Sequence, residues 1–208
     1  MMGIKAILRP VVHAARKARQ RRRIRKLVAN TPRVALGSGR SAYDRWISTD
    51  INILDITSEK DWKSCFEPES LEALLAEHVW EHLTPEQAAA AARNCFNYLK
   101  PGGYLRIAVP DGFHPSEGYI KWVTEGPPES GADDHKVLYN YKTFSEVFSA
   151  AGFQVRLLEY YDENGVFHFE EWDPDDGYIS RSKRYDPGHS RRGFSEPFTS
   201  IIIDAVKA

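Results

Sequence analysis

Acidic and histidine side chains that could move a proton follow two apolar runs of the sequence. Glu77 and His78 come directly after LEALLA, Asp111 and His114 follow YLRIAVP, and His135 lies in the polar stretch DDHK. Such groups act as general bases when they reach a reacting hydroxyl, which contributes roughly 10²- to 10⁴-fold to a rate. We expect His114 or His135 to be the base, with Asp111 a further catalytic candidate and Glu77 or His78 positioning a ligand. The alternative for each is a structural hydrogen bond.

His78 and His82 stand four residues apart, each directly after a glutamate, Glu77 and Glu81. Ligands at positions i and i+4 share one face of a helix, as in some zinc sites. The order is not H-E-x-x-H, however, and we expect this pair to pack and cap rather than to bind metal. The stretch DPDDG lacks the spacing and the terminal glutamate of a calcium loop, so we interpret it as a turn.

The stretch VALGSGRSA places Gly37, Gly39 and Ala42 in the G-x-G-x-x-A pattern of dinucleotide-binding loops. Those loops hold a pyrophosphate at the amino terminus of the helix that follows. Only residues 40–45 separate Gly39 from an apolar run that begins at Trp46, whereas a parallel crossover with a helix needs at least about ten residues. The sequence therefore predicts no phosphate-binding helix. A plain turn between two strands is the alternative to a ligand site.

A ligand with a ribose and an adenine but no phosphate does not need that helix, and S-adenosylmethionine is such a ligand. Its ribose hydroxyls suit a carboxylate, its amino-acid group suits close approach to glycine backbone, and its adenine amino group suits an acid or a carbonyl. Asp50, the turn 37–39 and Asp55 supply these groups in that order. We expect them at the carboxyl ends of successive strands, where open sheets bind ligands.

The elements that must position these residues alternate between strands and helices. Apolar runs predict strands within 33–39, 46–56, 71–79, 104–110, 153–161 and 198–206. Thr84 with Gln87 forms a capping box for a helix that ends at KPGG, and Thr143 with Glu146 forms a second box for a helix that Gly152 closes. Residues 112–141 have no clear period, so we interpret them as a functional loop region. The runs on either side of DPDDG, within 163–185, predict an inserted β-hairpin.

This alternation predicts an α/β fold with a mostly parallel sheet and helices on both faces. The last two strands have only the inserted hairpin between them, which predicts an antiparallel strand at the end of the sheet. A chain of 208 residues suits one such domain.

Several motifs together resemble the class I S-adenosylmethionine-dependent methyltransferases, in a branch of predicted methyltransferases. LGSG, AEHVWEHLTPEQA and NYLKPGGYLRIAVPD occur in order, followed by HKVLYNY, AGFQV and the closing apolar run. The resemblance covers about residues 33–208 and implies a Rossmann-like, seven-stranded sheet with S-adenosylmethionine as cofactor. The cofactor-binding positions that it implies are Gly37, Ser38, Gly39, Asp50, Asp55, Ile56, Ala76, Glu77 and His78.

The first 33 residues carry eleven lysines and arginines and no acid, although the net charge of the chain is −1. Apolar side chains recur there at helical spacing, at Ile4, Ile7, Leu8, Val11, Ala15 and Ala18. We therefore predict a basic amphipathic helical arm, 1–30, ahead of a methyltransferase domain, 31–208. Such helices bind anionic membrane surfaces or nucleic-acid phosphates, here through residues 5–26. The alternative is a solvated helix without a partner.

The favoured function is methyl transfer to a small-molecule or saccharide acceptor, at oxygen. Aromatic residues of 112–141 and of the hairpin suit such an acceptor or a homodimer surface. The alternative is a catalytically weak module of the same fold that the arm docks on a membrane or nucleic acid. The missing helix disfavours a nicotinamide oxidoreductase. Cys65 and Cys95 lack the spacing of a disulfide framework or metal site, which favours the cytoplasm, with peripheral membrane attachment through the arm.

Overall fold

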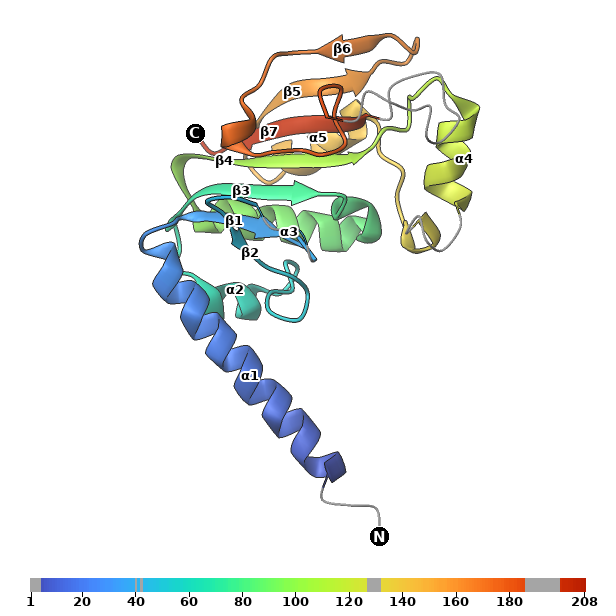
Figure 1. Cartoon of the computed structure of the whole chain (residues 1–208). Helices are drawn as coiled ribbons and strands as arrows, with labels where there is room; N and C mark the ends of the chain where they lie inside the picture. Colours follow the sequence, from blue (N-terminus) through green and yellow to red (C-terminus); the bar gives the residue numbers. More distant parts are fainter. Residues whose placement is uncertain (1–4, 40, 42, 127–131, 186–198) are drawn as a thin grey trace.

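Seven strands form one sheet in the order β2-β1-β3-β4-β7-β5-β6 (Figure 1). The computed structural model describes residues 5–39, 41, 43–126, 132–185 and 199–208. The strands are β1 (Arg33–Leu36), β2 (Ile47–Ser48), β3 (Leu71–Glu77), β4 (Leu99–Pro110), β5 (Gln154–Tyr161), β6 (Phe167–Phe169) and β7 (Ser200–Val206). β1 pairs in parallel with β2 and β3, and β3 with β4, whereas β7 is antiparallel to β4 and β5. The predicted α/β sheet with an antiparallel last strand is confirmed.

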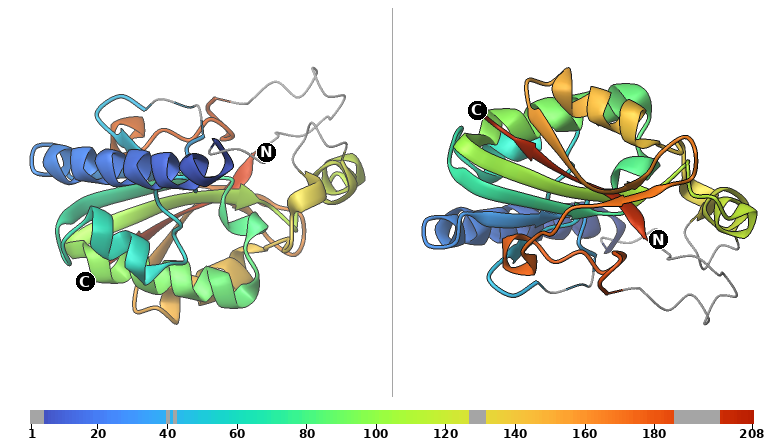
Figure 2. Two further views of the ribbon diagram at one scale, coloured as in Figure 1. Left: turned by 90° about the horizontal axis from the view of Figure 1, so that it is seen from below. Right: turned by 90° about the horizontal axis from the view of Figure 1, so that it is seen from above.

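Helices lie on both sides of this sheet. They are α1 (Lys5–Val28), α2 (Glu59–Cys65), α3 (Pro85–Tyr98), α4 (Glu117–Glu125) and α5 (Tyr141–Ser149), with the 3-10 helices η1 (Trp80–His82), η3 (Ala132–Asp134) and η4 (Pro174–Asp176). α3 and α5 cover one face, and α1 lies on the opposite side at the β2 edge (Figure 2). The segment 170–185, which contains η4, completes the cover on that second side.

The alternation of side chains along the strands builds a core on each face of the sheet. Leu74 and Ile203 belong to the larger cluster, which includes the buried residues of α3 and α5. Leu75 and Ile202 belong to a second cluster, which Trp172 closes from the segment 170–185. The sheet is therefore buried on both faces, as mostly parallel sheets require.

The helix caps explain where α3 and α5 begin. Thr84 accepts a hydrogen bond from the Gln87 backbone, and the Gln87 side chain accepts one from the Thr84 backbone at 2.9 Å, so the predicted capping box is confirmed. The second predicted box is wrong by one turn. Asn140, not Thr143, is the N-cap of α5, because its carboxamide accepts the backbone N–H of Lys142 and of Thr143.

Two helices lie where the sequence pattern predicted none. α4 falls inside the segment 112–141 that we interpreted as loop, and Ser116 caps it. α2 follows the N-cap Ser58 and buries Trp62. The predicted second strand is correspondingly short, because turns occupy most of 49–57. With seven and nine residues, α2 and α4 span too few turns for a clear helical period.

The predicted hairpin about DPDDG is wrong. The hairpin that forms joins β5 to β6 through a turn in which Gly165 N–H donates to the Asp162 carbonyl at 2.9 Å. DPDDG begins η4 instead, and no strand follows it in the described residues 177–185. Trp172 is not free to form a dimer surface, because its side chain is buried against the sheet with its indole N–H bonded to Glu159.

A buried ion pair ties β4 to β7 and to the segment 170–185. Arg106 donates two hydrogen bonds to Asp204, each of 2.8 Å, and a third from Nη1 to the Asp173 carbonyl at 2.7 Å. The guanidinium lies over the Trp172 ring, 5.0 Å from its centroid. Loss of either charge leaves the other buried without its partner, which typically destabilises a protein by about 3–5 kcal/mol.

We predict that Asp204→Asn lowers the free energy of unfolding by about 3 kcal/mol, because the Arg106 charge then stays buried without a counter-ion. Chemical denaturation measures this change. The matched control is Glu163→Gln, which removes the half-exposed ion pair with Lys142 and is expected to change stability little, because solvent screens such a pair. Equal losses in the two variants would contradict the role of burial.

Candidate functional site

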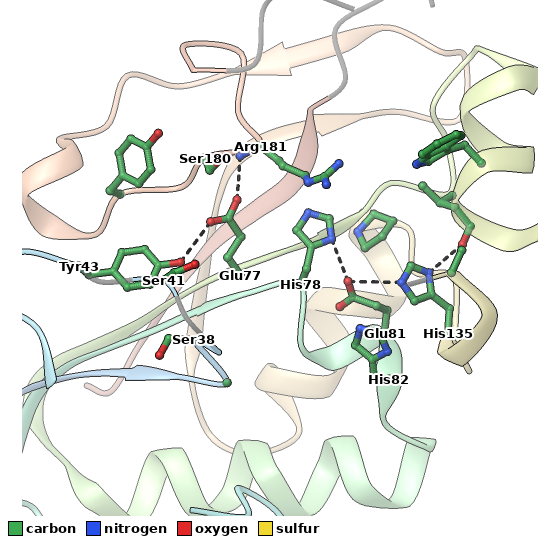
Figure 3. A pocket seen from close by; sticks show the side chains of 16 residues that line it. Ser38, Ser41, Tyr43, Glu77, His78, Glu81, His82, His135, Ser180 and Arg181 are labelled. Carbon is green, nitrogen blue, oxygen red and sulfur yellow. Dashed lines mark hydrogen bonds and ion pairs between the residues drawn. The ribbon is translucent and has the colours of Figure 1, made fainter. Parts of the chain in front are cut away.

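A cavity of about 630 Å³ opens at the carboxyl ends of β1, β3 and β4. Its floor is formed by the strand ends, at Gly37, Glu77 and Pro110. One wall comes from α4 and η3 with His135, and another from the segment 178–181. Figure 3 shows the side chains that point into this space. The volume lies within the range of about 300–1,000 Å³ that is usual for small-ligand pockets.

The glycine turn has the backbone conformation that only glycine adopts freely. Gly37 and Gly39 have φ of +59° and +57°. A Cβ on Gly37 would meet Val79 at 2.7 Å, whereas a Cβ on Gly39 would meet nothing within 4 Å. The turn is therefore packed from below at Gly37 and open at Gly39. No helix follows it in the described residues 41 and 43–46, as predicted from the short connection.

Parallel pairing brings Asp50 beside this turn. The Ser38 N–H donates to the Thr49 carbonyl at 2.9 Å, so the end of β1 is bonded to the end of β2. Asp50 follows directly and accepts the Asn52 N–H through Oδ1 at 2.8 Å. Its side chain does not line the 630 Å³ cavity but a neighbouring one of about 300 Å³ under Lys17 of α1. The turn therefore separates Asp50 from the larger cavity.

Four of the predicted cofactor positions, Gly39, Asp55, Ile56 and Ala76, do not line either of these cavities. Asp55 accepts hydrogen bonds from the backbone and hydroxyl of Thr57, at 3.0 and 2.7 Å. Ile56 and Ala76 are buried in the larger core cluster. The prediction for Asp55 and Ile56 assumed a strand end at 50–56, but the chain turns there and leads into α2 instead. The cavity linings therefore lend no support to Asp55, Ile56 and Ala76, which stay predictions.

Glu77, at the end of β3, is held by two groups from distant segments. Its Oε1 accepts the Arg181 backbone N–H at 2.7 Å, and its Oε2 lies 3.4 Å from the Tyr43 hydroxyl. Burial and the Glu77 carboxylate raise the pKa of Tyr43 to about 12, so this hydroxyl stays protonated. Sequence reasoning missed Tyr43 and Arg181, because nothing in the chain order places them beside β3.

His78 connects the end of β3 to a buried carboxylate. Its Nδ1 lies 2.9 Å from Glu81 Oε1 and its Nε2 3.1 Å from the Ser200 hydroxyl, while its backbone has φ of +54°. Such a backbone conformation is strained for a residue with a Cβ and is common at functional sites. Burial would raise the pKa of Glu81, but attraction to His78, its hydrogen bond and nearby His82 outweigh burial and hold that pKa below its usual value.

His135 has one ring nitrogen fixed and the other facing the cavity. Nδ1 lies 2.7 Å from the Val123 carbonyl, which can only accept, so Nδ1 carries the proton and Nε2 carries the lone pair. Nε2 lies 3.9 Å from Glu81 Oε1. Burial lowers the pKa of His135 despite the Glu81 charge, which keeps the ring neutral. These are the properties that a general base requires.

The other two catalytic candidates lie outside the cavity lining. Asp111 is fully buried and accepts the backbone N–H groups of Phe113 and Tyr161. His114 is 4% exposed, and its ring stacks on Tyr119 with centroids 3.9 Å apart. Both residues follow β4 as predicted, but Tyr119 of α4 and Tyr161 of β5 contact both of them. These contacts are those of structural residues, and the cavity lining lends no support to the catalytic prediction for Asp111 and His114.

Of the aromatic residues in 112–141 that were expected to line an acceptor site, Trp122 does line the cavity. Tyr119 and Tyr139 are buried, and Tyr141 donates its hydroxyl to Glu163 at 3.1 Å. The aromatic content of the segment therefore serves packing more than ligand contact.

No protein-family model and no curated protein matches the sequence. Solved structures do match the fold. An S-adenosylmethionine-dependent methyltransferase from Archaeoglobus fulgidus superposes with a TM-score of 0.54 and 16% identity over 92% of this chain and 94% of that one. Further matches are methyltransferases from Thermotoga maritima (TM-score 0.48, 14% identity, 85% and 82% covered) and Mesorhizobium loti (0.46, 13%, 84% and 90%). The first likeness shows that this chain has the Rossmann-like fold of these enzymes.

We predict a pH dependence of stability from Asp111, whose pKa is raised by burial to about 6. The unfolded chain has the ordinary value of about 3.9, so the folded chain binds this proton more tightly. The contribution of Asp111 to stability is therefore present at low pH and is lost as pH rises from about 4 to 6.

The measurement is the difference in unfolding free energy between the parent chain and Asp111→Asn. We expect the parent to lose about 2 kcal/mol relative to the variant between pH 4.5 and pH 7. A difference that stays flat, or that moves in favour of the parent as pH rises, would show that the carboxyl is not buried in its neutral form.

Proposed function

We propose that the chain is an S-adenosylmethionine-dependent methyltransferase. The observation that carries the proposal is the turn 37–39, which lies at the ends of parallel strands, is open at Gly39 and has no helix after it in the described residues. A diphosphate at that turn would lack the helix dipole that normally holds it, whereas an adenosyl amino acid needs no such dipole. The fold shared with the Archaeoglobus fulgidus methyltransferase supports the same cofactor.

The residues around the turn fit this cofactor. Asp50 Oδ2 has no hydrogen-bond donor among the described residues and is the group we assign to the ribose hydroxyls. The backbone at Ser38 and Gly39 offers the close approach that the amino-acid group requires, because a Cβ on Gly39 would meet no non-adjacent atom of the described residues within 4 Å. Glu77 and His78, at the end of the neighbouring strand, line the 630 Å³ cavity together with Ser38, whereas Asp50 lines the smaller one. When bound, S-adenosylmethionine supplies a methyl group already activated on a sulfonium.

The chain's own contribution to methyl transfer would be to orient the acceptor and to accept a proton. Most of the rate of an in-line displacement can come from holding the two reactants together. We assign the base to Nε2 of His135, which is neutral and faces the cavity. His78, which is bonded to Glu81 and lines the same cavity, would help to position the ligand. A hydroxyl on a small molecule or a saccharide is the acceptor that a neutral imidazole and the Trp122 wall suit best.

The alternative, a catalytically weak module docked by its basic helix, is supported by the surface of α1. One side of the helix is attached to the domain: Lys17 and Arg21 pair with Asp61, and Ile24 and Val28 are buried. The other side exposes a stripe of cations that contact no acid among the described residues, at Arg16, Arg19, Arg22, Arg23 and Lys26. We propose that this stripe binds an anionic membrane surface or nucleic acid, whether the chain is an active methyltransferase or a catalytically weak module.

Ile24 and Val28 of α1 belong to the larger core cluster. The role of the helix is therefore better tested by substitutions on its exposed side than by deletion of residues 1–30, which would remove these two core residues. None of the described helices has the length and apolar content to cross a membrane. A cytoplasmic location, with peripheral contact through the stripe, and a homodimer remain proposals that rest on the sequence.

Calorimetry with S-adenosylmethionine, S-adenosylhomocysteine and NAD tests the cofactor assignment. We expect micromolar binding of both sulfur ligands and none of NAD. Asp50→Ala should weaken binding about 10- to 100-fold, the usual cost of losing hydrogen bonds to a charged group. Asp44→Ala, at an almost fully exposed side chain on the same connection, is the matched control and should bind normally. Binding of NAD in preference to the sulfur ligands would refute the proposal. No binding of any of the three ligands would favour the catalytically weak docking module.

The cation stripe predicts salt-dependent binding that charge removal abolishes. We expect the chain to sediment with vesicles of anionic lipid, or to shift RNA on a gel, at about 50 mM salt and much less at 300 mM. The variant with Arg16, Arg19, Arg22 and Arg23 all changed to Gln should lose this retention and keep its thermal midpoint, because these side chains are exposed. Retention by neither ligand would leave α1 as a solvated helix.

A further inference from the structure

We propose that Glu81, His82 and His135 form a binding site for a divalent transition metal of the zinc class. Each of the three residues offers a ligand atom, and these atoms all lie within 4.8 Å of one another. The cluster stands at the opposite end of the cavity from Ser38 and Tyr43 (Figure 3). The proposal does not depend on the assigned cofactor.

The backbone holds the two segments that supply these residues together. Glu81 and His82 lie on η1, directly after β3, whereas His135 follows η3 more than fifty residues later. The Glu81 carbonyl accepts the N–H groups of Lys136 and Val137, at 2.7 and 3.2 Å. The three candidate ligands therefore come from two backbone segments that are hydrogen-bonded to each other.

Unsatisfied polar atoms in the cluster indicate that a partner belongs there. Glu81 has no solvent exposure, and while its Oε1 is bonded to His78, its Oε2 has no hydrogen-bond partner. The Nδ1 atom of His82 is also buried without a hydrogen bond, and the carboxylate that pairs with it, Asp134, keeps its Oδ2 atom 3.5 Å away. An unsatisfied group of this kind usually costs about 1–3 kcal/mol, and more when it is charged. A cation between these atoms would satisfy both.

Outer hydrogen bonds orient the ligands as they do in established metal sites. His135 donates Nδ1–H to the Val123 carbonyl at 2.7 Å, which leaves the Nε2 lone pair directed at Glu81. His78 bonds the carboxylate of Glu81 from the other side. Bonds of this type fix the tautomer and the ring orientation of a ligating histidine.

The donor set selects the kind of metal. Two imidazoles and one carboxylate suit zinc and its transition-metal neighbours, whereas magnesium and calcium prefer oxygen ligands alone. Tetrahedral zinc with bonds of about 2.1 Å brings its ligand atoms to about 3.4 Å from one another. Nε2 of His135 is 3.9 Å from Glu81 Oε1, and the His82 and His135 rings meet edge-on with centroids 4.8 Å apart. Small rotations of the side chains would therefore close the site.

Three protein ligands would leave one coordination position open, which is the arrangement of catalytic rather than structural zinc. Metal binding would use the same His135 lone pair that we assign to the base. In the loaded protein, an acceptor oxygen would thus be activated by the Lewis acid instead of by the imidazole. His135 would therefore be a metal ligand in the metal-bound protein and the general base in the metal-free protein.

The test is zinc titration of the untagged, chelator-stripped full chain, followed by cobalt substitution. We expect one Zn²⁺ per chain with micromolar affinity or tighter, a rise in the thermal midpoint on zinc addition, and visible cobalt absorption typical of four or five ligands. His135→Ala and Glu81→Gln should each weaken zinc binding at least about 100-fold. His168→Ala is the matched control, since that half-buried histidine lies on β6, is bonded to Asp162 and is outside the cavity lining.

Circular dichroism confirms that each variant folds. Glu81→Gln keeps the shape of the buried side chain, so it provides a second reading if His135→Ala is unstable. Three outcomes would overturn the proposal: no stoichiometric zinc in the parent chain, no cobalt absorption in the visible range, or zinc affinity that survives in His135→Ala and Glu81→Gln. The first two need no variant, and each stands whether or not S-adenosylmethionine binds.

Discussion

The parallel pairing of β1 with β2 on one side and β3 on the other is the constraint on which the site depends. This pairing places the carboxyl ends of three strands side by side. The glycine turn after β1 therefore lies between Asp50, which follows β2, and Glu77, at the end of β3. The Ser38 to Thr49 hydrogen bond fixes the first of these contacts. The connection from β1 to β2 is too short for a helix, and none follows the turn in the described residues 41 and 43–46. Our proposal of the ligand rests more on this short connection than on the glycine pattern.

Buried charge organises the rest of the molecule. On one face of the sheet, Arg106 and Asp204 join β4, β7 and the segment 170–185, and this segment in turn supplies Arg181 to Glu77. At the far end of the cavity, the Glu81 carboxylate is bonded to His78. The Glu81 carbonyl accepts the N–H groups of Lys136 and Val137, which directly follow His135. A carboxylate without exposure requires positive or hydrogen-bonding partners. His78 and His82 next to Glu81 therefore stabilise that charge.

The sequence predicted those parts of the fold whose signals are local. The core strands β1, β3, β4, β5 and β7 follow apolar runs, and Thr84 with Gln87 marks the start of α3. It failed where tertiary contacts decide. α2 and α4 are too short to show a period, and DPDDG is held by Arg106 rather than forming the turn between two paired strands. Among the site residues, Gly37, Ser38, Glu77, His78 and His135 line the cavity as expected. Asp111 and His114 follow a strand in the same way, yet both are in contact with Tyr119 and Tyr161, which no spacing in the sequence reveals.

The central claim is that the turn 37–39 receives an adenosyl amino acid between Asp50 and Glu77. A crystal structure of the chain grown with S-adenosylhomocysteine tests it most directly. The account predicts density that runs along Ser38 and Gly39, with the ribose hydroxyls on the Asp50 carboxylate and the sulfur facing the cavity that His135 lines. Density for the ligand away from this turn, or a helix that begins near residue 40 and binds a phosphate, would contradict it.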